Sequence, residues 1–180
     1  MARKPYTLDW LIKNYLKFFA GDFGMEEGNI RRYYQEWSAK AKNDSVGDYL
    51  WHLFHELLDR IPKASLSPEL YAKYFSEVYY KMWEFMVYHE NRPANDCLQL
   101  GMEYRLIYEE QTLPFKFDVK ISSGHCCPYC DSLNGMMVTL QQVYQNKYLA
   151  SHKCTRPSGC NCRYASVPKR RKDGSLVLNR

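Results

Sequence analysis

The sequence lacks a hydrophobic run long enough to cross a membrane. A membrane-spanning helix needs about 20 consecutive apolar residues, and no segment of the 180-residue chain approaches that length. The N-terminal segment MARKPYTLDW also lacks the apolar stretch and the cleavage site of an export signal. We therefore expect a soluble, cytoplasmic protein that meets reducing conditions and does not associate with membranes.

Catalytic patterns are absent as well. The chain has no Ser/His/Asp or Cys/His arrangement, no glycine-rich loop to cradle phosphates and no open metal pattern that would leave a position for water. The segment His52-Leu-Phe-His55-Glu56 differs in order and spacing from the H-E-x-x-H of zinc proteases. It reads as the polar face of an amphipathic helix. Nothing in the sequence favours an enzyme.

Most of the chain also lacks an excess of positive charge. The net charge is +5, and residues 163–180 alone carry six basic side chains and one acidic one. Any attraction to a polyanion must therefore come from the C-terminal end. If the protein binds nucleic acid, the expected contacts are Arg163, Lys169, Arg170, Arg171 and Lys172.

Apolar residues recur at three- and four-residue steps through the first 112 residues, which predicts amphipathic helices. The clearest stripe runs from Val46 to Ile61, and Pro62 ends it. Four other stripes predict further helices. The expected helical ranges are about 8–20, 29–41, 46–61, 68–88 and 94–110. We therefore predict a helical domain over residues 1–112 that folds as a bundle of about five helices.

The apolar period changes after residue 112. Residues 115–121 alternate between apolar and polar side chains, as in a half-buried strand. Short strands at 136–138 and 164–167 and a helix at 139–149 are also predicted. The fold class is thus mainly α, with a small α+β subdomain over residues 113–168 that a metal clamps. A basic tail, residues 169–180, follows it.

Six of the seven cysteines fall between Cys126 and Cys162, in two clusters. The first contains Cys127-Pro-Tyr-Cys130, whose spacing lets a tight turn aim both sulfurs at one point. A closed structural zinc site needs four cysteine or histidine ligands. We predict a structural Zn²⁺ held by four of six candidates, with iron as the other metal to consider. The six candidates, of which the first two are the most secure, are Cys127, Cys130, His152, Cys154, Cys160 and Cys162.

Two other uses of the cysteines must be weighed. Disulfides fit poorly with an odd number of cysteines in a reducing compartment. The CPYC sequence is also the glutaredoxin active-site motif, which needs its first thiolate at a helix N-terminus. The following Asp-Ser-Leu-Asn-Gly predicts a turn rather than a helix. The metal site is therefore favoured, and Cys97, far from the clusters in sequence, is expected to be a free core thiol.

The segment from about residue 115 to 168 resembles the C-terminal signature of phage Mu F-like minor head, or head-morphogenesis, proteins. The resemblance rests on the CPYC-Asp-Ser-Leu133-Asn-Gly135 stretch, then His152, the Cys160-Asn-Cys162-Arg163 segment and Pro168. In that family the histidine stands just before the C-x-C. Here residues 153–159 intervene and bring Cys154, so whether His152 or Cys154 is a ligand stays open.

The resemblance implies a non-enzymatic assembly role near the portal during head assembly or DNA packaging, with capsid- or portal-type protein partners. A nucleic-acid-binding zinc module that uses the basic tail is the alternative hypothesis. A thiol–disulfide redox protein that acts through Cys127 and Cys130 is the third.

Overall fold

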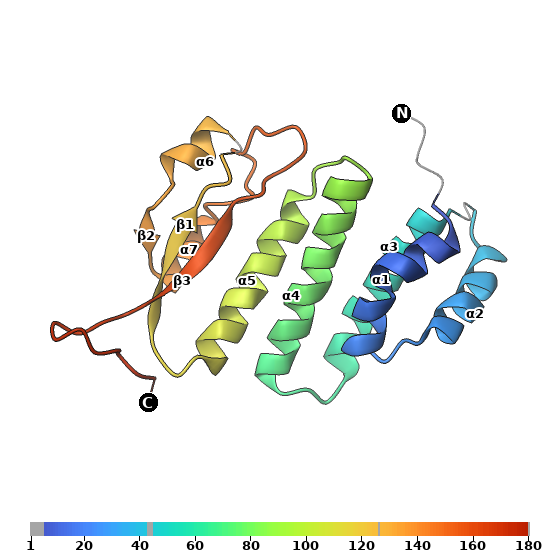
Figure 1. Ribbon diagram of the computed structural model, residues 1–180, viewed down its shortest axis with the longest axis horizontal. Coiled ribbons are helices and arrows are strands. Elements are labelled where there is room, and N and C mark those ends of the chain that lie inside the picture. The colour runs from blue at the N-terminus through green and yellow to red at the C-terminus, as the bar shows by residue number, and fades with distance from the viewer. Residues whose placement is uncertain (1–5, 43–44, 126, 180) are drawn as a thin grey trace. The chain divides into compact units, whose positions relative to one another are not determined.

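The computed structural model describes residues 6–42, 45–125 and 127–179 (Figure 1). In this part of the chain, seven α-helices are combined with one three-stranded sheet. This confirms the expected mainly helical fold with a small sheet and a cysteine cluster in the C-terminal region. None of the described helices is both long and apolar enough to span a membrane. The chain divides into two compact units, Met1–Ala64 and Ser65–Arg180.

The first unit consists of three amphipathic helices. They are α1 (Leu8–Gly21), α2 (Glu27–Ser38) and α3 (Val46–Arg60), which a 3-10 turn, η1 (Ile61–Lys63), follows. Thr7 caps α1, because its Oγ1 accepts a hydrogen bond from the backbone N–H of Trp10 at 3.1 Å. The core is apolar and aromatic, with Phe19 stacked on Phe54. Inside it, the Tyr49 hydroxyl donates to the Ile30 carbonyl at 2.7 Å.

A pair of helices begins the second unit. These are α4 (Pro68–Glu84), which a π-helical turn η2 (Phe85–His89) continues, and α5 (Asn95–Thr112). The two helices pack closely, since a Cβ at Gly101 would lie 3.3 Å from the Tyr80 ring. The buried Ser76 hydroxyl also donates to the Gly101 carbonyl at 2.9 Å. Helix α5 contacts β3 as well, so it joins the helix pair to the sheet (Figure 1).

The sheet has the strand order β2-β1-β3, with both pairings antiparallel. Strand β1 (Phe117–Ser122) lies between β2 (Met137–Val138) and β3 (Arg163–Pro168). The two short helices between the strands are α6 (Pro128–Ser132) and α7 (Leu140–Asn146). Thr139 and Gln142 form a capping box at the start of α7. The helix ends earlier than the sequence suggests, because Lys147 adopts a left-handed conformation with φ of 46°.

The second unit has one continuous core. It combines residues of α4 and α5, such as Trp83 and Met102, with the inward residues of the sheet and most of the clustered cysteines. The boundary expected between residues 112 and 113 therefore falls inside this unit. The chain segment after β3 also pairs with this unit through the backbone. The backbone N–H of Lys116 donates to the Val177 carbonyl at 2.7 Å, and the backbone N–H of Lys169 donates to the Lys116 carbonyl at 2.8 Å.

Candidate metal centre

The first pair of thiols is placed by the turn that follows β1. Cys127 is the N-cap of α6 and Pro128 occupies the first helical position, where its fixed φ suits the start of a helix. Cys130 lies in the single turn that follows and is fully buried. The turn is tied to β1, because Gly135, at φ of 82°, donates to the Ile121 carbonyl at 2.8 Å. A residue without a side chain suits that backbone conformation.

The second group of thiols lies on the long connection from α7 to β3. Its fold depends on side chains that the sequence does not mark as functional. The backbone N–H of Cys160 donates to Asn95 Oδ1 at 2.8 Å, and Trp83 Nε1 donates to the Cys160 carbonyl at 3.2 Å. On the other side, the Tyr164 hydroxyl accepts from the backbone N–H of Leu149 at 3.1 Å. The helix pair thus holds the C-x-C in place.

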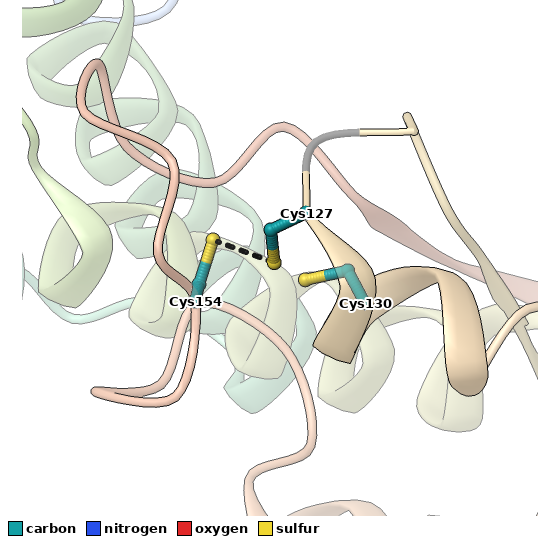
Figure 2. Close-up of side chains that lie close together, drawn as sticks. All are labelled: Cys127, Cys130 and Cys154. Atoms are coloured by element: carbon teal, nitrogen blue, oxygen red, sulfur yellow. Dashed lines mark hydrogen bonds between the residues drawn. The ribbon is translucent and has the colours of Figure 1, made fainter.

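Five thiols converge in this region. Cys127, Cys130 and Cys154 form one group, and Cys130, Cys160 and Cys162 form another, with all sulfurs of a group within 4.8 Å of one another. The sulfurs of Cys127 and Cys154 are 3.9 Å apart (Figure 2), and those of Cys130 and Cys160 are 4.0 Å apart. A Zn–S bond of about 2.3 Å implies a sulfur–sulfur distance of ~3.8 Å in a tetrahedral site. The distances of these two pairs fit such a site.

The surroundings of Cys127 favour a thiolate. Burial raises the pKa of the Cys127 thiol, but hydrogen bonds from the backbone N–H groups of Cys130 and Thr155, together with the thiols of Cys130 and Cys154, outweigh this effect and lower the pKa to about 6. At Cys162 the sulfur accepts a hydrogen bond from the backbone N–H of Gly124 at 3.3 Å. N–H donors of this kind stabilise sulfur that carries negative charge.

Cys160 shows the opposite tendency in the absence of a metal. Its hydrogen bond to the Cys162 thiol and its complete burial raise the pKa of the Cys160 thiol well above its ordinary range. Two adjacent sulfurs cannot both ionise easily without a nearby cation, since like charges repel at short range. A divalent ion would remove that penalty and bind both as thiolates.

Of the six predicted ligands, the structure brings five together. His152 is exposed and belongs to neither ligand group among the described residues. Cys154, the residue that competes with it in the sequence, belongs to the first group. Every described cysteine is a thiol rather than half of a disulfide, and Cys126 lies outside the described residues. Burial raises the pKa of the Cys97 thiol, which is partly buried, to about 11.

The sequence predicts a turn rather than a helix after CPYC, but a short helix, α6, extends to Ser132. Cys127 is the N-cap of a five-residue helix, because Pro128 favours helix initiation more strongly than the following Asp-Ser-Leu-Asn-Gly opposes it. This short helix and the lowered pKa of Cys127 are features that a redox cysteine shares with a metal thiolate. Three further thiols lie around Cys127 and Cys130, and metal ligation could use them, whereas thiol–disulfide exchange does not need them.

The basic residues near the C-terminus are spread over two elements. Arg163 is exposed at the start of β3, and Lys169 forms an ion pair of 2.9 Å with Asp118. Arg170, Arg171 and Lys172 are exposed on a hairpin that a bridge between Arg170 and Leu176 closes. The expected tail is therefore a folded hairpin in residues 169–179, within the part of the chain that the structure describes.

Fold and site together define a mainly helical protein whose C-terminal region carries a cysteine cluster that could bind a metal ion. Comparisons with models of protein families, with curated proteins and with solved structures returned no match to this chain.

Proposed function

We propose that the cysteine cluster binds zinc as a structural centre of a non-enzymatic assembly protein. The observation that carries the zinc assignment is the convergence of five thiols from two short chain segments, in two groups that each contain a pair of sulfurs about as far apart as two ligands of a tetrahedral zinc ion. Thiolate ligands of this number select zinc over magnesium or calcium, which prefer oxygen ligands. Iron also binds four thiolates, and metal analysis distinguishes it from zinc.

A structural role is supported by the place of the thiols in the core. Cys130, Cys160 and Cys162 have no exposed surface, and they pack with Trp83, Val143 and the inward side of β1. A zinc ion at this position would link α6, the connection after α7 and the start of β3. In small zinc peptides such binding contributes on the order of 10 kcal/mol to folding, enough to decide the stability of this region.

The proposed biological role is that of a phage head-morphogenesis protein, acting with portal- or capsid-type partners. It rests on the resemblance of the C-terminal segment, whose pattern residues have structural uses here. Pro128 starts α6, Leu133 packs against the core and Gly135 adopts a positive φ. These uses support a shared zinc turn, and the assembly role follows from the resemblance alone.

The first experiment is metal analysis of the full chain purified without added metal, paired with a count of reactive thiols. Zinc in the protein, with the clustered thiols unreactive until a chelator is added, supports the structural centre. A metal-free protein with a rapidly alkylated Cys127 would instead favour the redox use of CPYC. The assembly role is tested separately, by mixing the zinc-loaded chain with the portal and major capsid proteins of the same genome and measuring complex formation by sedimentation. If the chain sediments as a free protein in the presence of each partner, so that no complex forms, the assembly role is contradicted.

Nucleic-acid binding is the second candidate, and the C-terminal hairpin favours it. The backbone N–H of Arg171 donates to the Ser175 carbonyl at 2.8 Å, and the Arg170 guanidinium donates to the Gly174 carbonyl at 2.8 Å. The hairpin therefore presents Arg170, Arg171 and Lys172 on an ordered turn, and basic β-ribbons of this kind can contact phosphates.

This candidate is tested with a charge variant of the hairpin, Arg170→Gln, Arg171→Gln and Lys172→Gln. DNA binding that weakens steeply with salt and loses most of its salt dependence in the triple variant supports it. The matched control removes three exposed charges from the first unit, Lys13→Gln, Lys17→Gln and Lys63→Gln. Equal losses in both variants would indicate a general charge effect, which argues against the hairpin as a specific contact.

A further inference from the structure

Among the described residues, the cluster contains one thiol more than a tetrahedral ion can bind. Cys127 and Cys130 come from the turn at α6, Cys154 comes from the connection after α7, and Cys160 and Cys162 precede β3. The sulfurs fall into two groups of three, and Cys130 is the member that both groups share. Figure 2 shows the first group, with the Cys127 sulfur between those of Cys154 and Cys130 in this view.

The spacing of the sulfurs argues against a single ion. Around one tetrahedral zinc ion, each of the six sulfur–sulfur distances is ~3.8 Å. Among the described residues, no four ligand atoms lie within 4.8 Å of one another. The Cys127–Cys154 sulfur distance is 3.9 Å and the Cys130–Cys160 distance is 4.0 Å, and these two pairs belong to different groups. Each group has one pair of sulfurs close to this distance and all three sulfurs within 4.8 Å, so each can supply three thiolates to one ion.

We infer that the cluster binds two zinc ions, one at each group, with the Cys130 sulfur bridging them. Cys127 and Cys154 complete the thiolate ligands of the first ion, and Cys160 and Cys162 complete those of the second. This inference rests on the proposed function, because it requires that the cluster binds a thiophilic metal. It extends that proposal by assigning a role to all five thiols and by making Cys130 the central ligand.

The charge of the site favours the second ion. Five thiolates around one Zn²⁺ would leave a net charge of −3, or would require one or more of the thiols to stay protonated. Five thiolates around two ions leave −1. Cys130, Cys160 and Cys162 are completely buried, and uncompensated charge in a buried position is strongly destabilising. A second ion therefore stabilises the thiolate form of the whole cluster.

The two ions should differ in accessibility. Each has three thiolates, so a fourth ligand such as water completes its tetrahedral coordination. The first group includes Cys154, which is only partly buried, whereas all three thiols of the second group are fully buried. We expect a chelator to remove the ion at Cys127, Cys130 and Cys154 first, and the ion at Cys130, Cys160 and Cys162 in a slower phase.

The test is the zinc content of the full chain, measured by elemental analysis and by native mass spectrometry. Two zinc ions per chain are expected. One ion per chain would overturn the two-ion centre and leave the structural zinc site of the proposed function intact. A protein that takes up no zinc would overturn both. The three results are distinct masses in the native spectrum.

Variants assign the ions to the groups. Cys154→Ser and Cys162→Ser are each expected to lower the zinc content from two to one, whereas the matched control Cys97→Ser keeps two. A Cys154→Ser protein that retains the full wild-type metal content contradicts the assignment. The wild-type chain substituted with ¹¹³Cd provides a readout that does not depend on a variant's folding. Two coupled cadmium resonances are expected, and a single resonance overturns the bridged centre.

Discussion

The two units of the chain reach a buried core by different means. In the first unit the largest fully buried side chains are aromatic and aliphatic, among them Phe19, Tyr49 and Phe54. In the second unit, the described residues after α5 include twelve buried apolar side chains, and four of these are cysteines. One unit can therefore be stabilised by hydrophobic burial, whereas part of the other depends on the chemical state of its thiols.

This difference matters because cysteine is a small apolar residue. Burying a Leu or Phe side chain contributes about 1.5–3 kcal/mol, and a thiol contributes less because it is smaller. Strand β1 buries Phe117, Val119 and Ile121, but its neighbour β2 has only two residues, and Met137 there is half exposed. The strands alone therefore bury few large apolar side chains, and packing against α5, together with any metal that links the loops, would add to the stability of the sheet region.

Removal of the metal is the change with the largest expected effect. With a chelator present, residues 113–179 should lose protection from hydrogen exchange, because zinc contributes on the order of 10 kcal/mol to domains that depend on it. Residues 6–42 and 45–64 should keep their protection. The measurement is hydrogen exchange followed by mass spectrometry of peptides from both units.

Restored zinc is the control for this experiment, since it should return protection to residues 113–179. Equal protection of the sheet region with and without the chelator would show that its apolar core is sufficient. Loss of protection in both units at once would show instead that the first unit does not fold independently.

A cavity in the first unit should destabilise that unit and leave the metal-binding region unchanged. Leu53→Ala removes a fully buried side chain from α3 and is expected to lower the free energy of unfolding of this unit by about 2–5 kcal/mol. Zinc content should not change. The measurement is denaturant unfolding of the zinc-loaded protein, followed through peptides of the first unit. A Leu53→Ala protein that loses zinc would show that the two units are energetically coupled.

The elements that the sequence predicts most reliably are those set by local signals. The stripe from Val46 to Ile61 gives α3, and the Ser67-Pro68 pair gives the start of α4. The five clustered thiols are also visible from spacing. His152 and Cys154 could not be separated in the sequence, because the choice depends on how the connection from 147 to 162 folds. That connection has left-handed residues at Lys147 and Ala150, which no local pattern marks.

The residues that hold the second thiol group were missed for a related reason. Asn95 and Trp83 contact Cys160 from α5 and α4, far away in sequence. The Asn91–Asn95 stretch predicts a break between helices and contains no indication of a contact 65 residues later. The boundary expected at residue 112 lies inside the second compact unit for the same reason. The apolar periodicity identifies α5 but not the surface against which this helix packs.

Cys97 offers a smaller comparison between a core thiol and the clustered thiols. Burial raises its pKa to about 11, compared with an ordinary value of about 8.5. Stability from the neutral thiol is thus fully present below the unfolded-state pKa and is lost as the pH rises towards 11. Alkylation of Cys97 at pH 8 should be at least tenfold slower than that of an unfolded reference peptide. Mass mapping of iodoacetamide adducts measures this rate, and alkylation as fast as the peptide's would contradict the buried assignment.

The smallest expected effects come from two matched helix caps, Thr7 of α1 and Thr139 of α7. Both hydroxyls accept a backbone N–H, from Trp10 at 3.1 Å and from Gln142 at 3.2 Å. Each Thr→Ala change should cost about 1 kcal/mol. In Thr7→Ala this loss appears only in the unfolding of the first unit. Helix α7 lies in sequence between Cys130 and Cys154.

The proposed structural zinc centre couples metal binding to folding in that region, so the cost of Thr139→Ala should appear in the zinc affinity. A loss of about 1 kcal/mol corresponds to roughly a fivefold weaker apparent affinity, and competition with a chromophoric chelator can measure it. Thr7→Ala should bind zinc with the wild-type affinity. If both variants weaken zinc binding equally, folding of the first unit contributes to the metal centre. If neither does, the site is preformed and the sheet region folds without the ion.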